Sequence, residues 1–383
     1  MGINERTRRT ARMAHPLQTA TDRKTAPDGA SSEVPQPTRL SRRALLQTAG
    51  ATASLSLLAG SALAQPAASA PAAPAVIQPS TKITIIWNPS SLCLVVVGLA
   101  QQRGIFEKHG LEVDTLNVGS DTNAILEAVA LGKADATSNN ILRFIKPLEA
   151  GFDVKLTAGV HAGCSYLIAS RAAGITSIAD LRGKRIGMAD LASPNKFLYA
   201  SVLKKAGIDP DNDITWRQFP ADVFSLAVDK GEIDAFVDNH PNAYFVVKRS
   251  QGKLFELASN GTGELGMRTC CVLAIRGSLI RENRPAAAGL TRAFVEAALL
   301  VDGDNSLAVT AARHFAPHKA SDEEIGEMIA SYPYDAQRGC PTGEEFRQQV
   351  LSYARDLKEV GVLKPGTDPV RFTNRVFVDL LKA

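Results

Sequence analysis

The chain has 383 residues, 45% of them hydrophobic and 21% charged, a composition typical of globular proteins rather than disordered or fibrous ones. Its formal net charge of +4 comes from the first 64 residues, which hold nine Lys or Arg and four Asp or Glu. The remainder has 34 basic and 35 acidic residues. No basic surface for nucleic acid is therefore expected there.

Residues 1–64 are predicted to be an export signal with a disordered N-terminal extension. Arg42 and Arg43 precede a short apolar stretch, and an A-L-A sequence that is typical of a cleavage site precedes Gln65. The segment SRRALLQ resembles the twin-arginine pattern S-R-R-x-F-L-K, with Leu and Gln in place of Phe and Lys. The apolar stretch is too short to span a bilayer, and no Cys follows the cleavage site. We therefore expect a periplasmic protein without a membrane anchor, exported by the twin-arginine route.

Residues 65–81, rich in Pro and Ala, are predicted to be a tether, and strand and helix patterns alternate after it. The predicted elements are, in chain order, strand 82–87, helix 94–110, strand 111–118, helix 121–134, strands 155–160 and 165–171, a helix and a strand within 177–190, helix 195–207, a helix and a strand within 221–239, and strand 271–275. From Pro285 on the pattern is mostly helical. This alternation with short Gly turns predicts an α/β fold with mainly parallel sheets.

Five segments of the chain, between about residues 82 and 280, carry a resemblance to a known family. They read GLAQQRGIFEKHGLEV, LEAVALGKADA, ITSIADLRGKRIGM, LKKAGIDPDNDITW and LAVDKGEIDAFVDNHP. In this order they resemble the periplasmic substrate-binding proteins of ABC importers. The group concerned is the NMT1/THI5-like one, which includes nitrate-, alkanesulfonate-, taurine- and thiamine-precursor-binding members.

The resemblance implies a type II-like, two-lobed periplasmic-binding-protein fold, with two crossover hinge strands and a ligand cleft between the lobes. Lobe one would comprise 82–170 plus 268–383, and lobe two would comprise 171–267. A protein of this group binds a small-molecule ligand and delivers it to an ABC permease with its ATPase subunit. We expect a monomer that needs no cofactor and performs no catalysis.

The resemblance also indicates which loops contact the ligand, since ligands bind beyond the carboxyl ends of the strands. Their candidate residues are Asn88, Ser90, Ser91, Ser120, Thr122, Ser138, Asn139, Asn140, Ser193, Asn195, Lys196, Asp238, Asn239 and His240, together with His161 and Cys164 near the first crossover. The same residue types are favoured in caps and turns, so each position also has an ordinary structural interpretation.

The charged groups near the predicted cleft narrow the range of ligand classes. Helix N-termini, Lys196 and His161 favour an organic anion such as a sulfonate or carboxylate. Asp121 and Asp238 act in the opposite direction, and they leave a neutral or amine-bearing heterocycle open.

The chain has five cysteines, of which Cys270 and Cys271 are adjacent in a predicted strand. Strand alternation predicts that these two sulfurs point to opposite faces. The resemblance places Cys164 and this pair on or beside the crossovers, where a Cys164–Cys270 disulfide is one interpretation. In a second, one sulfur lines the cleft floor with Cys93, and in a third all are buried thiols.

An enzyme is the alternative to a receptor. A cytosolic relative makes the thiamine pyrimidine with a His and a cysteine-rich motif, and the nearest candidates here are His161, Cys164, Cys270 and Cys271. These residues show no recognisable metal-ligand spacing, so no metal site is predicted. A metal- or thiol-dependent binding protein that uses the same residues is the other alternative, and export argues against a biosynthetic role.

Overall fold

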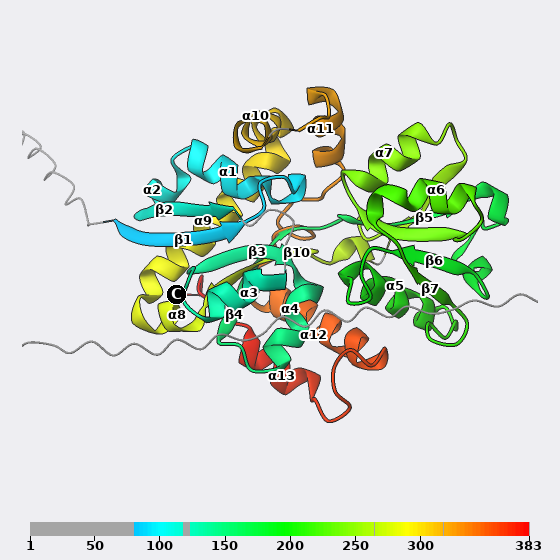
Figure 1. Cartoon of the computed structure of the whole chain (residues 1–383). Coiled ribbons are helices and arrows are strands. Elements are labelled where there is room, and N and C mark those ends of the chain that lie inside the picture. Colours follow the sequence, from blue (N-terminus) through cyan, green and yellow to red (C-terminus); the bar gives the residue numbers. More distant parts are fainter. Residues whose placement is uncertain (1–79, 118–122, 264, 317, 383) are drawn as a thin grey trace, which may run out of the picture. The chain divides into compact units, whose positions relative to one another are not determined.

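The computed structural model describes residues 80–382 except 118–122, 264 and 317 (Figure 1). The predicted signal, and the predicted tether up to residue 79, lie outside the described residues. The strands form two five-stranded sheets, each covered by helices. The expected α/β fold is therefore present.

The first sheet has the order β2-β1-β3-β10-β4. Its strands are β1 (Thr81–Trp87), β2 (Leu111–Asn117), β3 (Ala136–Asn140), β4 (Val154–His161) and β10 (Cys271–Arg276). β1 runs parallel to β2 and β3, whereas β10 is antiparallel to both of its neighbours, β3 and β4. The continuous apolar run in β10 is explained by this central position, because both of its faces are covered by other elements.

The second sheet has the order β7-β6-β8-β5-β9. Its strands are β5 (Ser165–Ser170), β6 (Arg185–Met188), β7 (Thr215–Gln218), β8 (Ala235–Asn239) and β9 (Leu254–Ser259). We expected residues 165–170 in the first lobe. The antiparallel pairing of β5 with β8 and β9 instead places this strand in the second sheet.

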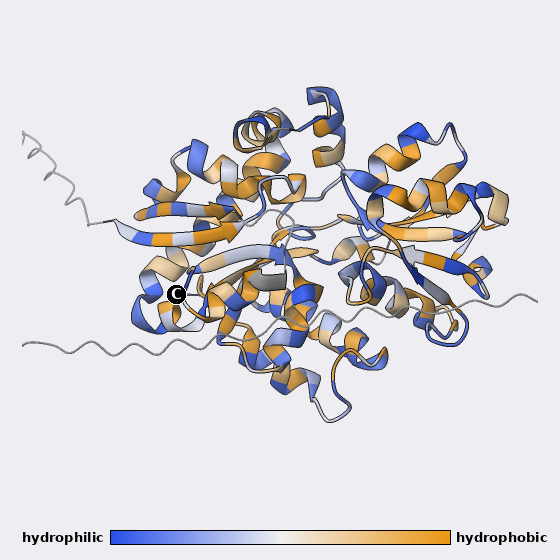
Figure 2. Cartoon of the chain, viewed as in Figure 1, coloured by the Kyte–Doolittle hydropathy of each residue, from blue (hydrophilic) through white to orange (hydrophobic). Residues whose placement is uncertain are grey.

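Amphipathic helices pack their apolar faces on these sheets and leave polar faces outside (Figure 2). They are α1 (Val95–Gln102), α2 (Ile105–Lys108), α3 (Asn123–Ala130), α4 (Ile141–Glu149), α5 (Pro194–Lys205), α6 (Phe224–Asp229), α7 (Asn242–Arg249), α8 (Gly277–Glu282), α9 (Arg284–Gly303), α10 (Asn305–Phe315), α11 (Asp322–Ala330), α12 (Gly343–Glu359) and α13 (Pro369–Val376). The helix predicted over 94–110 is interrupted at Gly104, whose φ of +64° is left-handed. In the part of the chain that the structure describes, no helix is long and apolar enough to cross a membrane.

The chain passes between the sheets twice, at residues 162–164 and 260–270, and the two crossovers lie side by side. Cys270 N donates to His161 O at 2.7 Å, and Ser165 N donates to Asn260 Oδ1 at 2.7 Å. The backbones approach closely at Gly163, where a Cβ atom would lie 2.9 Å from the Cα of Gly261. The two sheets are thus joined by one compact pair of hydrogen-bonded segments.

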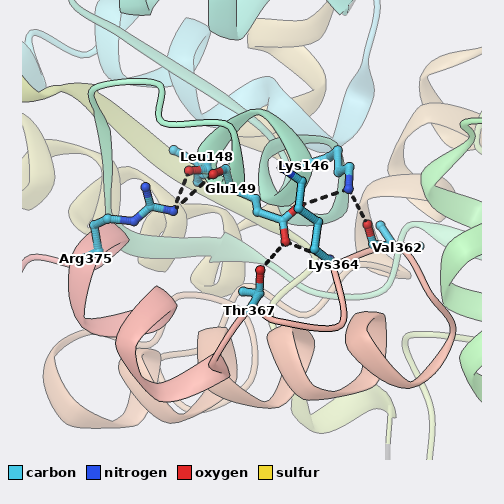
Figure 3. Close-up of polar contacts among 7 residues, drawn as sticks. All are labelled: Lys146, Leu148, Glu149, Val362, Lys364, Thr367 and Arg375. Carbon is cyan, nitrogen blue, oxygen red and sulfur yellow. Dashed lines mark hydrogen bonds and ion pairs between the residues drawn. The ribbon is translucent and has the colours of Figure 1, made fainter.

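The C-terminal segment is fastened to the end of α4 through Glu149 (Figure 3). Thr367 Oγ1 and the backbone N–H of Lys364 donate to Glu149 Oε1 at 2.5 and 2.8 Å. Lys146 Nζ donates to Glu149 Oε2 at 2.9 Å, and Arg375 donates to the carbonyl of Leu148. This contact ties residues that are more than 200 positions apart in the sequence.

Candidate functional site

A chain of amide hydrogen bonds lies where the strands of the second sheet meet the first crossover. Asn239 ends β8, and its Nδ2 donates to the carbonyl of Cys164 at 2.5 Å. Asn195, in the first turn of α5, donates to Asn239 Oδ1 at 2.8 Å and accepts from Ser165 Oγ. Three predicted site residues, Asn195, Asn239 and Cys164, are thereby brought together. The two side-chain amides bond to each other, and Asn239 also bonds to the first crossover at Cys164.

The network continues into the first sheet through two sulfur atoms. Asn140 ends β3, and its Oδ1 caps α4 by accepting from the backbone N–H of Leu142 at 2.9 Å. Its Nδ2 donates to Cys270 Sγ at 3.3 Å, and Cys270 Sγ lies 2.9 Å from Cys164 Sγ. The ends of the two sheets are therefore connected through Cys270 and Cys164. All five cysteines are free thiols in the structure, and the Cys164–Cys270 disulfide stays a prediction.

Four potential ligand atoms gather beside this network. Cys93, His161, Cys164 and Cys271 each offer one, and all four atoms lie within 4.8 Å of one another. The thiols of Cys270 and Cys271 also lie close enough to Cys164 to shift its pKa, which Cys270 raises and Cys271 lowers. The expectation that Cys270 and Cys271 serve opposite faces is therefore wrong, because Cys270 precedes β10 and is not subject to strand alternation.

His161 belongs to this cluster and is fully buried. Its Nδ1 is 2.9 Å from the carbonyl oxygen of Ala162, and its ring lies 5.6 and 5.5 Å from the rings of Tyr332 and Tyr334. Its Nε2 is buried and has no hydrogen-bond partner among the described residues. The imidazole ring is thus held in place through Nδ1, whereas Nε2 has no hydrogen-bond partner among the described residues.

The thiols of the cluster have divided pKa values. Interaction with Cys164, and next with Cys271, lowers the pKa of Cys93 well below its ordinary value. The pKa of Cys270 is likewise lowered, first by Cys164. The pKa of Cys164 is raised, chiefly by Cys270, and burial raises that of Cys271. Cys93 and Cys270 are therefore the two thiols of this group whose pKa values are lowered.

His240 and several aromatic residues line a cavity next to this cluster of ligand atoms. Its ring stacks on Tyr166 with centroids 4.0 Å apart and lies 5.7 Å from Tyr332. A cavity of about 480 Å³ is lined by His240, Tyr166, Tyr244, Lys248, Glu327 and Ser331, among others. Burial lowers the pKa of His240 to about 4, so this ring is neutral at pH 7.

Other predicted residues have local structural roles. Asn88 Oδ1 accepts from the backbone N–H of Ser90, which makes a turn that Ser91 continues. Asn139 Oδ1 accepts from the backbone N–H of Asn140. Ser193 precedes α5 without a side-chain capping bond.

Two charged candidates are also engaged locally. Lys196 lies over the Trp216 ring at 5.7 Å, away from the amide network. Asp238 accepts from Asn242 Nδ2 at 2.5 Å, and burial raises the pKa of Asp238 to about 6.

Ser138 is fully buried, and its hydroxyl has no partner among the described residues. Ser120 and Thr122 lie outside the described residues.

Sequence reasoning missed several residues of the site. Tyr332, Tyr334 and Ser331 come from the C-terminal third, which shows only a helical pattern and no local signal for a site. Ser165 and Asn260 join the crossovers to each other. The Y-P-Y sequence around Pro333 marks a break between helices there.

A family model described as NMT1/THI5 like matches residues 94–322, which is more than half of the chain. The chain belongs to this family. Putative binding proteins of Brucella abortus are 28% identical over 202 residues, which is 53% of this chain and 61% of the relative. The chain thus spans about three fifths of the length of these curated relatives.

Solved structures of several periplasmic binding proteins have the same fold as this NMT1/THI5-like chain. The aliphatic sulphonate-binding protein SsuA of Escherichia coli superposes with a TM-score of 0.63 at 18% identity, covering 78% of this chain and 92% of that chain. The nitrate-binding protein NrtA of Synechocystis gives a TM-score of 0.60 at 14% identity, covering 78% and 86%. The predicted family and binding-protein fold are confirmed.

Proposed function

We propose that this chain is an extracytoplasmic solute receptor that delivers a small organic solute to an ABC import permease and its ATPase subunit. One observation carries the proposal. The amides of Asn140 at the end of β3, Asn239 at the end of β8 and Asn195 in the first turn of α5 converge on the crossovers. In open α/β folds, ligands bind beyond the carboxyl ends of the strands, where these three residues lie. The solved neighbours with this fold include the ligand-binding component of an ABC-type import system from Staphylococcus aureus.

The groups at this place suit binding better than catalysis. They are mainly amides and hydroxyls, which donate and accept hydrogen bonds without changing protonation state near pH 7. The hydroxyls of Thr137 and Ser138 on β3 are buried and have no hydrogen-bond partner among the described residues. Few convergent polar groups beside aromatic walls are typical of small-molecule sites.

An organic anion, such as a sulfonate, is the solute class that we propose. The first turn of α5 supports it, because Ser193 leaves that helix N-terminus without a side-chain cap. Backbone N–H groups at such a position favour negative charge. Lys196 gives no such support in this arrangement, because it lies over Trp216.

Transport follows from binding at a hinge. The two crossovers are adjacent, and closure of the sheets around them would enclose the solute and present one shape to the permease. We place the receptor in the periplasm, exported by the twin-arginine route, and propose that it acts as a monomer. Ligand-linked closure is then the signal that the permease recognises.

A thermal-shift screen tests the receptor proposal. The purified chain is heated with alkyl and aryl sulfonates, nitrate, aromatic carboxylates and pyrimidines. A ligand at about one hundred times its Kd adds about 2.7 kcal/mol of stability, and we expect a rise of several degrees for one organic class. Mass spectrometry should recover that ligand unchanged. A chemically altered ligand, or no response to any organic solute, would contradict the proposal.

A further inference from the structure

Four metal-ligand atoms from different segments meet beside the crossovers. Cys93 lies in the 3₁₀ turn after β1, His161 ends β4, Cys164 lies in the first crossover, and Cys271 begins β10. Their ligand atoms lie within 4.8 Å of one another. In a tetrahedral zinc site with zinc–sulfur bonds of about 2.3 Å, neighbouring sulfurs are about 3.8 Å apart. Small side-chain rotations are therefore enough to place all four atoms on one ion.

His161 provides an independent observation that points to a ligand. A carbonyl oxygen only accepts, so the contact with Ala162 O puts the ring hydrogen on Nδ1 and leaves a lone pair on Nε2. Nε2 is buried and has no hydrogen-bond partner among the described residues, which costs free energy. A backbone carbonyl that fixes the tautomer of a histidine is the usual outer-shell partner of a metal ligand. A metal ion on Nε2 would satisfy this atom.

The donor set selects the metal. Three thiolates and one imidazole are soft or borderline ligands, which prefer Zn²⁺ or Cu⁺ to Mg²⁺ and Ca²⁺. We propose that Cys93, His161, Cys164 and Cys271 bind one thiophilic metal ion, with Zn²⁺ as the reference case. The ion replaces the thiol protons, which leave to solvent, while the imidazole stays neutral. Cys93 is partly exposed and gives the ion its route of entry.

The position of the site indicates what the ion does. It joins the turn after β1 to the first crossover and to β10. The turn after β1 carries predicted solute-contacting residues, so the ion fixes one wall of that region relative to the hinge. His161 and Cys164 are also predicted solute contacts, but the solute proposal is carried by the amides of Asn140, Asn195 and Asn239, none of which supplies a ligand atom to the metal site.

Cobalt substitution tests the metal site directly. The whole purified chain is reduced, stripped with a chelator and titrated with Co²⁺. We expect one equivalent to bind, with a sulfur-to-cobalt charge-transfer band and the intense visible bands of a tetrahedral ion, and Zn²⁺ should displace it. Mg²⁺ and Ca²⁺ should leave the spectrum unchanged. Absence of the charge-transfer band in the reduced chain would overturn the proposal.

Variants locate the ion. Cys93→Ser and His161→Asn should each weaken Co²⁺ binding at least tenfold, and Cys93→Ser should weaken the charge-transfer band or abolish it. Cys340→Ser is the control for loss of a thiol, because buried Cys340 donates to the carbonyl of Tyr334 at 3.0 Å outside the cluster. It should bind like the parent chain. Unchanged binding by Cys93→Ser, or equal loss in Cys340→Ser, would refute the assignment.

The two proposals fail separately. Partly exposed Cys93 is the position least needed for folding, and circular dichroism checks that its variant is folded. Metal binding without any organic ligand in the thermal-shift screen would leave the metal site intact and contradict the receptor. An organic ligand that binds equally well before and after chelation, in a chain that takes up no Co²⁺, would do the reverse.

Discussion

Replacing Glu149 with Gln tests how the C-terminal segment is held to α4. Thr367, Lys146 and the backbone of Lys364 all donate to this carboxylate, whose side chain is only 5% exposed (Figure 3). Burial alone would raise the pKa of Glu149. The three hydrogen bonds outweigh burial and lower the pKa from 4.5 to about 2. The charged form therefore stabilises the fold.

The size of the effect follows from this shift. A change of about 2.5 pKa units at about 1.36 kcal/mol each gives about 3 kcal/mol of stabilisation at pH 7. Because the folded-state pKa is the lower one, this stabilisation is present above about pH 4.5 and is lost as the pH falls towards 2. We expect Glu149→Gln to reduce the free energy of unfolding by about 3 kcal/mol at pH 7, by about 2 at pH 3.5 and by about 1 at pH 3.

Urea denaturation of the parent and the variant at these pH values, followed by circular dichroism, measures the difference. Glu344→Gln is the matched control, because the pKa of Glu344 is also lowered to about 2, by Arg347 and Gln348, but its carboxylate is in solvent. Screening makes such a pair weak, so the control should change stability little. Equal losses in both variants, or a loss at Glu149 that does not shrink with falling pH, would refute the reasoning.

Three other changes address the hinge and the site. Burial raises the pKa of Asp238 to about 6, so the charged form of this carboxyl is disfavoured in the folded chain. The folded chain therefore loses stability as the pH rises from about 4 through 6 and Asp238 becomes charged. Asp238→Asn should therefore stabilise the chain by about 3 kcal/mol at pH 8 and hardly at all at pH 4, as measured by urea denaturation at both values; a gain that is independent of pH would contradict this. Gly163→Ala places a Cβ 2.9 Å from Gly261 at a φ of +75° and should lower the Tm more than Gly174→Ala, which has a φ of +65° but open space around it; equal Tm values would show that crossover packing is loose. Asn239→Ala removes the bond to Cys164 and should weaken solute binding at least tenfold by calorimetry while the Co²⁺ spectrum is kept, whereas loss of the spectrum would place Asn239 in the metal site.

The sequence predicted the fold well because the fold depends on local periodicity. The apolar runs at 82–87 and 271–275 became β1 and β10, and Gly104 interrupts a predicted helix because it takes a left-handed conformation. The assignment of 165–170 to the first sheet was different in kind. Which sheet a strand joins depends on pairing with distant strands, here β8 and β9, and periodicity does not report it.

The site was harder to predict than the fold. Asn140, Asn195 and Asn239 were correctly expected near the strand ends, but Asn195 bonds to Asn239, and Asn140 and Asn239 bond to the crossovers. Residue type alone does not distinguish a cap from a ligand contact, because both need the same donors and acceptors. The residues of the His161 cluster do not follow the sequence spacing of any metal-binding motif. They lie on different elements, which only the tertiary fold brings together.

Cys164 connects the interpretations of this region, because its sulfur lies 2.9 Å from Cys270 and within the group of four ligand atoms. A thiolate bound to a metal ion cannot simultaneously form a disulfide, so the two fates exclude each other. A disulfide to Cys270 would remove one of the four ligands and leave Nε2 of His161 unsatisfied again. A bound ion would instead satisfy His161 and keep Cys270 free to accept from Asn140. Of the two, only the metal-bound state accounts for both the buried imidazole and the gathered sulfurs.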